Sequence, residues 1–451
     1  MSDTIVAIST KLGVGAISII RVSGDNAISL VNKIFRGKDL TKVESHTINY
    51  GFIHDGKEDI DEVLVSVMRA PKTFTREDIV EINCHGGIAT TLRILDLLIE
   101  NGGRRAEAGE FTKRAFLNGR IDLTEAEAVM DLIESKTDNS RKLALSSLEG
   151  SLKKYINSFR DKLKHVLANI EVNIDYPEYY DIEEVTRKEL KEVITSLEKD
   201  LKNLVTKSEE RQIIKNGIKT IIIGRPNVGK SSILNRFLKE DKAIVTDIEG
   251  TTRDIVEGSI IFDGIELSLI DTAGIRDTDN LAEKIGVEKS LSLIDKANLI
   301  IVVLNSSEEL TDNDKFILDK VKDKNPIIVL NKNDLPSKID KSKLDFKHIV
   351  STNTNTLDGI EPLKEEIKSM FKLSEIKEDD YTYLANERQL SLAKQALKSL
   401  SQAKVSLDND EPVDIIEIDL KEVFDILGSI TGESYSDELL DELFANFCVG
   451  K

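Results

Sequence analysis

The stretch from Gly224 to Ser231, GRPNVGKS, has the residue types and spacing that bind a nucleoside phosphate. It fits G-x-x-x-x-G-K-[S/T] and stands between the apolar run 221–223 and a segment of helical pattern, the context that a P-loop requires. Its glycines let the backbone curl around one anion, and the following helix adds its positive end. We expect Lys230 to reach the outer phosphates and Ser231 to hold Mg²⁺. The nucleotide-binding residues predicted here are Gly224, Asn227, Val228, Gly229, Lys230, Ser231 and Ser232.

Three further motifs follow in the order that a GTPase requires. Asp271-Thr272-Ala273-Gly274 comes after the strand pattern of residues 265–270, where the aspartate can hold Mg²⁺ through water and the glycine can admit a γ-phosphate. Asn331-Lys332-Asn333-Asp334 follows the apolar run 327–330. A carboxylate there accepts hydrogen bonds from N1–H and the exocyclic amine of guanine, so Asp334 selects GTP over ATP. Ser351, followed by Thr352 in place of the usual small residue, stands where a further loop would support the base.

The segment between the P-loop and Asp271 holds candidates for sensing the γ-phosphate. One threonine of Gly250-Thr251-Thr252-Arg253-Asp254 could complete the Mg²⁺ shell. Residue 275 is isoleucine, whereas small signalling GTPases place a water-orienting glutamine there. Another group must therefore orient water, and the polar residues nearby are Arg276, Asp277, Asp279 and Glu283. The Asn227 amide oxygen could coordinate a monovalent cation in place of an arginine finger; the alternative is an asparagine that bonds its own backbone.

Composition narrows the class of protein. The 451 residues carry a net charge of −19, and residues 378–451 hold 6 Lys and Arg against 17 Asp and Glu, a net of −11. A basic surface usually marks nucleic-acid binding, so if the chain works on RNA we expect a partner to supply much of the phosphate contact. No apolar run approaches the roughly 18 residues of a membrane span, and no signal sequence is visible. Two distant cysteines, Cys84 and Cys448, fit a reducing, cytoplasmic location.

The pattern along the chain predicts a multidomain α/β plus all-α fold. Residues 1–120 read as an α+β domain, with strands at 5–8, 16–22, 46–50 and 62–67 and helices at 26–35 and 87–101. Residues 121–213 and 377–451 show the periodicity of long helices, interrupted at Pro177 and near 408–412. Alternating strands and helices fill 214–376. The simplest architecture is a long-helix domain interrupted by an inserted P-loop GTPase domain.

The motifs and their order resemble the MnmE (TrmE) family of tRNA uridine modification GTPases over the whole chain. Besides the GTPase motifs, the resemblance rests on segments near both ends. These are TIVA at 4–7, RVSG at 21–24, EINCHGG at 81–87, GEFTKRAFLNGR at 109–120 and the terminal FCVGK at 447–451. The terminal Cys-x-Gly-Lys is very specific. The family pattern has basic-x-Pro before Gly109, whereas this chain has Glu107-Ala108.

The resemblance implies an N-terminal domain that binds a tetrahydrofolate derivative and dimerises. It also implies that the homodimer works with an MnmG-type FAD protein on certain tRNAs. The product carries an aminomethyl or carboxymethylaminomethyl group on carbon 5 of the wobble uridine, with folate carrying the one-carbon unit. By position, the folate contacts are Arg21, Glu81, Arg120 and Lys451. A pterin offers an amide-like edge that suits a carboxylate, and its glutamate tail suits basic side chains.

For the GTPase domain, the resemblance implies that two such domains meet across the dimer around K⁺, which stabilises charge at the β–γ bridge. The residues that would hold the ions are, for K⁺, Asn227, Thr246, Ile248 and Thr251 and, for Mg²⁺, Ser231 and Thr252. The catalytic carboxylate maps to Glu283, filling the place left by Ile275, with Arg276 steadying that loop. Cys448 would be a nucleophile or acid in the modification; the alternative is a buried apolar thiol beside Phe447.

Two rival functions stay open at this point. One is a ribosome-assembly or RNA-binding switch GTPase, against which residues 1–120 and the Cys-x-Gly-Lys end count. The other is a scaffold that holds GTP without turnover. Binding of a reduced folate would separate the first rival from the expected function, and the effect of Glu283→Ala on hydrolysis would separate the second.

Overall fold

The computed structural model describes residues 3–175, 180–240, 242–244, 256–270, 294–356, 358–371 and 382–450. The chain forms two compact units, each assembled from separate stretches of sequence. The first comprises Met1–Met130, Leu148–Glu198 and Ser391–Lys451, and the second comprises Asp131–Ser147 and Lys199–Leu390. Within the described residues, no helix is long and apolar enough to cross a membrane.

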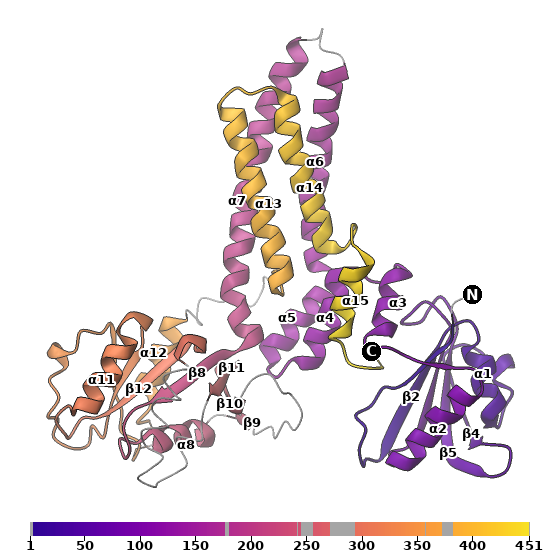
Figure 1. The fold of residues 1–451 in the computed structure, drawn as a ribbon, viewed down its shortest axis with the longest axis horizontal. Coiled ribbons are helices and arrows are strands. Elements are labelled where there is room, and N and C mark those ends of the chain that lie inside the picture. Colours follow the sequence, from indigo (N-terminus) through magenta and orange to yellow (C-terminus); the bar gives the residue numbers. More distant parts are fainter. Residues whose placement is uncertain are drawn as a thin grey trace. The chain divides into compact units, whose positions relative to one another are not determined.

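The N-terminal sheet in the first unit has seven strands in the order β3-β4-β5-β6-β2-β1-β7. Neighbours pair antiparallel except β1 and β7, which are parallel. The strands are β1 (Ile5–Ile8), β2 (Ile17–Ser23), β3 (Phe35–Arg36), β4 (Thr47–His54), β5 (Asp59–Met68), β6 (Ile79–His85) and β7 (Arg104–Arg105). Inward residues alternate with exposed ones, as in β4, so one face must be covered. Helices α1 (Ala27–Ile34) and α2 (Ile88–Glu100) cover it, and their apolar residues share one core with the strands (Figure 1).

Helix α3 (Glu110–Leu117) is tied to the N-terminal sheet by a cluster of charged side chains. Arg114, only 9% exposed, contacts Glu77 at 3.1 Å and Glu110 at 3.0 Å, and its Nη2 lies 2.6 Å from Asp3. Arg104 also pairs with Glu110. Burial raises the pKa of Glu110, but hydrogen bonds from these arginines outweigh it, so the net pKa is lowered. The cluster thereby fixes α3 beside β1, which positions the loop that precedes the helix.

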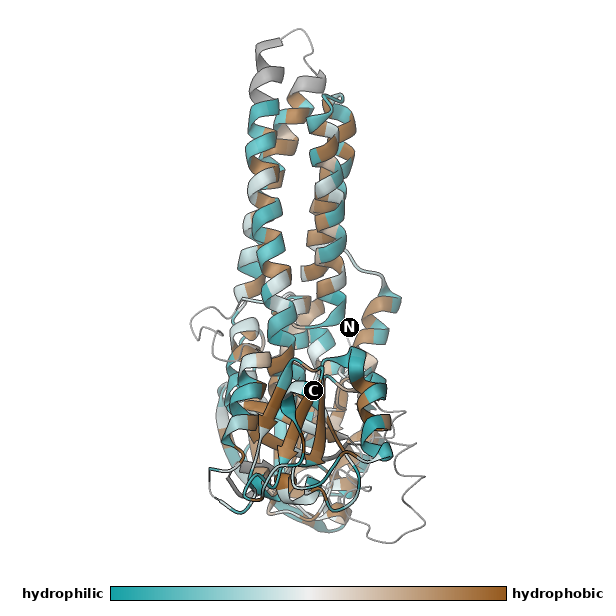
Figure 2. Ribbon diagram, turned by 90° about the vertical axis from the view of Figure 1, so that its left-hand side faces the viewer, coloured by the Kyte–Doolittle hydropathy of each residue, from teal (hydrophilic) through white to brown (hydrophobic). Residues whose placement is uncertain are grey.

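Long helices make up most of the remaining described chain in the first unit. They are α4 (Leu123–Glu134), α6 (Ser151–Asp175), α7 (Tyr180–Asn216), α13 (Glu387–Asp408), α14 (Val413–Thr431) and α15 (Asp437–Ala445), of which α4, α7 and α13 also have residues in the second unit. Hydrophobic and hydrophilic segments alternate along the long helices (Figure 2), as expected for helices that bury one face. The predicted interruption near 408–412 is confirmed, because α13 ends at Asp408 and α14 begins at Val413. The predicted break at Pro177 lies outside the described residues.

The sheet of the second unit has seven strands in the order β14-β13-β12-β8-β11-β10-β9. They are β8 (Ile218–Ile223), β9 (Lys242–Ile244), β10 (Val256–Phe262), β11 (Ile265–Ile270), β12 (Leu299–Asn305), β13 (Ile327–Asn331) and β14 (His348–Ser351). From β14 to β11 the pairs are parallel, and β10 and β9 continue antiparallel. Strands β12 and β13 are buried throughout, as central parallel strands must be.

Helices cover both faces of this second sheet, with a separate apolar cluster on each. They include α8 (Lys230–Glu240), α11 (Asp312–Val321) and α12 (Glu361–Met370). Helix α5 (Asp138–Leu148), although outside the expected insert, contributes Leu143 to one of these clusters. Because β8, β12, β13 and β14 run parallel, their carboxyl ends meet at one edge, where a ligand site is expected.

Candidate nucleotide site

The loop between β8 and α8 has the backbone that a phosphate cradle needs. Gly224 has φ +152°, and a Cβ there would lie 2.4 Å from the Val303 carbonyl oxygen. Gly229 has φ +104°, and a Cβ there would lie 2.1 Å from the Asn331 Nδ2 atom. Asn227 also has a positive φ of 62°. Both glycines are therefore required by left-handed backbone and by close neighbours together.

Lys230, the first residue of α8, turns its side chain back onto the loop. Its Nζ donates hydrogen bonds to the carbonyl oxygens of Gly224 at 2.7 Å and Arg225 at 3.0 Å. An ammonium group inside a curled loop at a helix N-terminus suits a phosphate chain. Ser231 follows in the first helical turn, where its hydroxyl is of the type that binds Mg²⁺. The residues present thus fit a nucleoside phosphate and its metal ion.

Asn331, the last residue of β13, joins the P-loop to the base motif. Its side chain is 1% exposed; Nδ2 donates to the Val228 carbonyl oxygen at 2.9 Å, and Oδ1 accepts from the Thr352 hydroxyl at 3.1 Å. The following residue, Lys332, has φ 63°, which turns the chain toward Asp334. Thr352, which departs from the usual small residue, therefore supports the motif through its hydroxyl group.

The predicted base-reading carboxylate stands at the exposed side of this edge. Asp334 is exposed, and its Oδ2 accepts a hydrogen bond from Asn355 Nδ2 at 3.1 Å. Ser351 ends β14 as expected, and its Oγ is buried without a hydrogen-bond partner within the described chain. Such an orphaned hydroxyl is a group that a ligand or a rearranged neighbour can satisfy. The loop that carries Asp334 is joined to the chain directly after Ser351, since Asn333 N donates to the Thr352 carbonyl oxygen at 3.1 Å.

Arg225 is a P-loop residue whose role the sequence did not reveal. Its Nε lies 3.2 Å from Asp314, which is 2% exposed in the capping box of α11, and its Nη2 pairs with Glu308. The guanidinium lowers the pKa of Glu308 through this hydrogen bond. Glu308 in turn accepts from Asn305 at the end of β12, at 2.6 Å. Arg225 thus anchors the loop whose carbonyl groups hold Lys230.

Several predicted site residues lie outside the described part of the chain. They are Thr246, Ile248, Thr251, Thr252, Asp271, Thr272, Ala273, Gly274, Arg276, Glu283 and Lys451. The described residues therefore bring together the P-loop and the base-recognition motif, whereas the predicted switch and catalytic positions stay predictions.

A second candidate site lies in the first unit, where the two ends of the chain meet. Arg21 on β2 and Glu81 on β6 are direct neighbours in the sheet register, and Arg21 Nε donates to Glu81 Oε1 at 2.9 Å. Arg21 Nη1 also donates to the Gly450 carbonyl oxygen at 3.3 Å. The Arg21 guanidinium lies over the Phe111 ring, 5.7 Å from its centroid. The structure thus brings together two predicted folate residues and the residue before Lys451.

The C-terminal tail is bound to the loop before α3. Ala108 and Val449 form an antiparallel bridge, and Gly109 N donates to the Cys448 carbonyl oxygen at 3.3 Å. Gly450 has φ +91°, and a Cβ there would lie 2.5 Å from the Ile8 carbonyl oxygen, so only glycine fits. Cys448 itself is exposed, and the alternative reading of a buried apolar thiol is wrong. The backbone, rather than the thiol, makes these tail contacts.

Arg120 is linked to the same region through aromatic packing. Its Nη1 donates to the Thr73 carbonyl oxygen, and its guanidinium lies 5.3 Å from the centroid of the Phe74 ring. Phe74 packs against the small cluster that contains Phe111, the ring under Arg21. Two predicted folate arginines therefore flank one apolar cluster.

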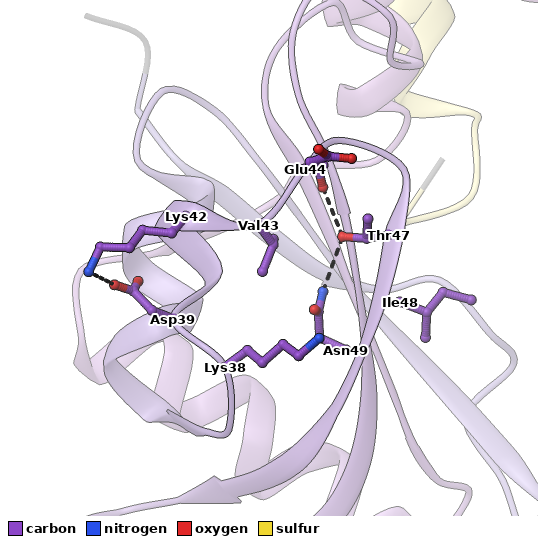
Figure 3. Close-up of a pocket in the computed structure, with 8 residues that line it drawn as sticks. All are labelled: Lys38, Asp39, Lys42, Val43, Glu44, Thr47, Ile48 and Asn49. Carbon is purple, nitrogen blue, oxygen red and sulfur yellow. Dashed lines mark hydrogen bonds and ion pairs between the residues drawn. The ribbon is translucent and has the colours of Figure 1, made fainter.

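A hollow beside strand β4 of the N-terminal sheet belongs to neither candidate site. Figure 3 shows its lining: Lys38, Asp39, Lys42, Val43, Glu44, Thr47, Ile48 and Asn49. Its polar groups satisfy one another, for example Lys42 with Asp39 at 2.9 Å and Thr47 with the Glu44 carbonyl oxygen at 2.8 Å. Strands β5 and β6 separate β4 from β2, which carries Arg21.

The fold and nucleotide site define a P-loop GTPase domain inserted into a helical domain. Sequence models of two families match: "GTP-binding protein TrmE N-terminus" over residues 4–120 and "MnmE helical domain" over residues 123–448. The chain belongs to the MnmE (TrmE) family of tRNA modification GTPases.

Individual relatives match from end to end. The chain is 53% identical over 450 residues to "tRNA modification GTPase MnmE" of Streptococcus thermophilus (strain CNRZ 1066), covering 100% of this chain and 98% of that protein. It is 52% identical over 451 residues to the protein of the same name from Lactococcus lactis subsp. lactis (strain IL1403), with the same coverage. Among solved structures, the G domain of the T. maritima FeoB iron transporter covers 34% of this chain and 98% of its own, at 28% identity and a TM-score of 0.26.

Proposed function

We propose that this chain is a K⁺-activated GTPase that acts with an MnmG-type FAD protein to modify carbon 5 of the wobble uridine in certain tRNAs. The added group is carboxymethylaminomethyl or aminomethyl. The observation that carries the GTPase part is the joining of the P-loop to the Asn331–Asp334 motif at one sheet edge, through the Asn331–Val228 hydrogen bond of 2.9 Å. A phosphate cradle and a guanine-reading carboxylate are thereby held in one frame.

We assign the hydrolysis chemistry to residues of the P-loop and of the segments that follow it in the chain. Lys230 holds the phosphates, while Ser231 and Thr252 hold Mg²⁺. The proposed K⁺ ligands are Asn227, Thr246, Ile248 and Thr251. Glu283 orients water and Arg276 steadies its loop, since Ile275 offers no polar group. A bound cation supplies positive charge that offsets charge developing at the β–γ bridge.

The folate part of the proposal rests on the junction of the two chain ends. Glu81 would bind the amide-like edge of a pterin, and Arg21, Arg120 and Lys451 would bind its anionic tail. Cys448 is exposed beside this junction, where a thiol can reach a substrate. Arg21→Ala should then lower the affinity for a reduced folate at least tenfold in calorimetric titration. Arg36→Ala, which removes an exposed arginine of β3, serves as the matched control.

The division of labour follows the expected boundaries. We propose a folate-binding and dimerisation domain at 1–120, a helical domain at 121–213 and 377–451, and a GTPase domain at 214–376. The homodimer brings two GTPase domains together around K⁺ and Mg²⁺, and GTP hydrolysis drives a conformational change instead of installing the carbon. Two unpaired cysteines favour a cytoplasmic location.

The decisive experiment is the GTPase rate of the full chain in KCl and in NaCl at equal ionic strength, at several protein concentrations. We expect K⁺ to accelerate hydrolysis strongly, with a rate per molecule that rises with concentration. Asn227→Ala should remove the difference between the salts, whereas Asn313→Ala, on the exposed side of α11, should keep it. Equal rates in the two salts for the unaltered chain would overturn the cation mechanism and restore the switch GTPase as the better reading.

A further inference from the structure

The loop that follows β14 is held firmly beside the base motif. Asn353 N donates to the Gly359 carbonyl oxygen at 2.9 Å, and Asn353 Oδ1 accepts from Asn355 N at 3.0 Å. From the P-loop helix, Arg236 Nε donates to the Thr354 carbonyl oxygen at 3.0 Å. The backbone on either side of residue 355 is therefore anchored both within the loop and to α8.

This anchored loop aims one side chain at Asp334. Asn355 Nδ2 donates to Asp334 Oδ2 at 3.1 Å, although both residues are exposed. An aspartate on a surface loop otherwise rotates among several staggered positions. The Asn355 amide group, presented by an anchored backbone, favours the orientation in which Asp334 accepts its hydrogen bond.

The orientation of this carboxylate matters for base recognition. Guanine presents two parallel donors, N1–H and the exocyclic amine, so both carboxylate oxygens must lie in the plane of the base. Hypoxanthine keeps N1–H and lacks the amine, so it needs only one oxygen in place. A paired arrangement depends on orientation more strongly than a single hydrogen bond does.

We propose that Asn355 is a positioning residue that orients the Asp334 carboxylate and thereby sets the preference for guanine over hypoxanthine nucleotides. The inference rests on the proposed GTP-binding function and extends it to a residue outside the motifs. A carboxylate offers about four lone-pair sites on its two oxygens, so Asp334 can accept one hydrogen bond from Asn355 while the base occupies other sites.

The test compares GDP and IDP affinities of the full chain by isothermal titration calorimetry. We expect Asn355→Ala to weaken GDP about three- to tenfold, the range of one hydrogen bond, and IDP less than twofold. Asn355→Asp should weaken GDP further, because two carboxylates then face each other. Asn355→Ser retains a short donor and should fall between the unaltered chain and Asn355→Ala. Asn313→Ala, another exposed asparagine of the same unit, is the control and should change neither affinity.

A double-mutant cycle isolates the link between the two side chains. In an Asp334→Ala background, which has no carboxylate to orient, adding Asn355→Ala should leave the GDP affinity unchanged within about twofold. If Asn355→Ala weakens GDP and IDP equally, or acts as strongly in the Asp334→Ala background, Asn355 only supports the loop and the proposal is overturned. Failure of the unaltered chain to bind GDP would instead refute the proposed function itself.

Discussion

The buried Asn331 side chain should carry much of the stability of the nucleotide site. Asn331→Ala leaves two buried groups without their partner, the Val228 carbonyl oxygen and the Thr352 hydroxyl. Val228 is fully buried and Thr352 is 1% exposed, so water does not readily replace the lost amide. At about 1–3 kcal/mol for each unsatisfied buried group, the free energy of unfolding of the second unit should fall by about 2–6 kcal/mol.

The assay for this loss is differential scanning calorimetry of the full chain, since the protein has no tryptophan to report unfolding by fluorescence. One kcal/mol corresponds to roughly 2–4 °C in a unit of this size, so the transition should move down by about 4–24 °C. Both hydrogen bonds that Asn331→Ala removes join one protein group to another, so the variant should lose mainly stability. GDP affinity should fall less, through the displaced loops.

Partner variants make the reasoning refutable. Thr352→Val removes the hydroxyl at similar volume and should cost about 1–3 kcal/mol by leaving Asn331 Oδ1 unpaired, whereas Thr352→Ser should stay near the unaltered protein. If Asn331→Ala melts within a degree or two of the Asn313→Ala control, the two hydrogen bonds do not stabilise the unit. A collapse of GDP affinity without any shift in melting would also contradict the argument.

Three further predictions concern the first unit. Arg114→Met should lower the free energy of unfolding by about 3–5 kcal/mol in urea, because it removes the arginine partner of the half-buried Glu77 carboxylate and one of the two arginines that pair with Glu110. The pKa of Glu110 is held below its ordinary value of 4.5, so its contribution is complete above that pH and should be lost as the pH falls through the lowered pKa. Of the two thiols, exposed Cys448 should react with a thiol reagent in the native protein; Cys84, buried and with a raised pKa, should react only on unfolding.

Each of these has a control within the same unit. Arg36→Met breaks an exposed ion pair and should cost less than about 1 kcal/mol, so an equal loss for Arg114→Met would contradict the burial argument. The acid-dependent loss should shrink in Glu110→Gln, and an unchanged profile would assign it to other groups. Two thiols that react at one rate in the native protein would refute the difference in burial.

The sequence sufficed for the local parts of the site. The P-loop could be predicted from residue spacing, because Gly224, Lys230 and Ser231 lie close together in the sequence and need no distant partner. The principal helices and most strands follow from periodicity in the same way. Strand β6 was missed although Val80 to Cys84 alternate apolar and polar residues, and that signal was available. The α3 helix was also missed, although it is as long as α1, which was predicted.

What the sequence by itself supplied is the predicted chemistry of each segment: a phosphate loop, a carboxylate expected to read guanine and a terminal Cys-x-Gly-Lys. Only the tertiary structure decided which segments meet. Asn331 bridges residues 228 and 352, and Gly450 reaches Arg21 across more than 400 residues of chain. Such contacts depend on strand order and on the packing of whole elements. Local periodicity specifies neither, so these partners could not be predicted from spacing alone.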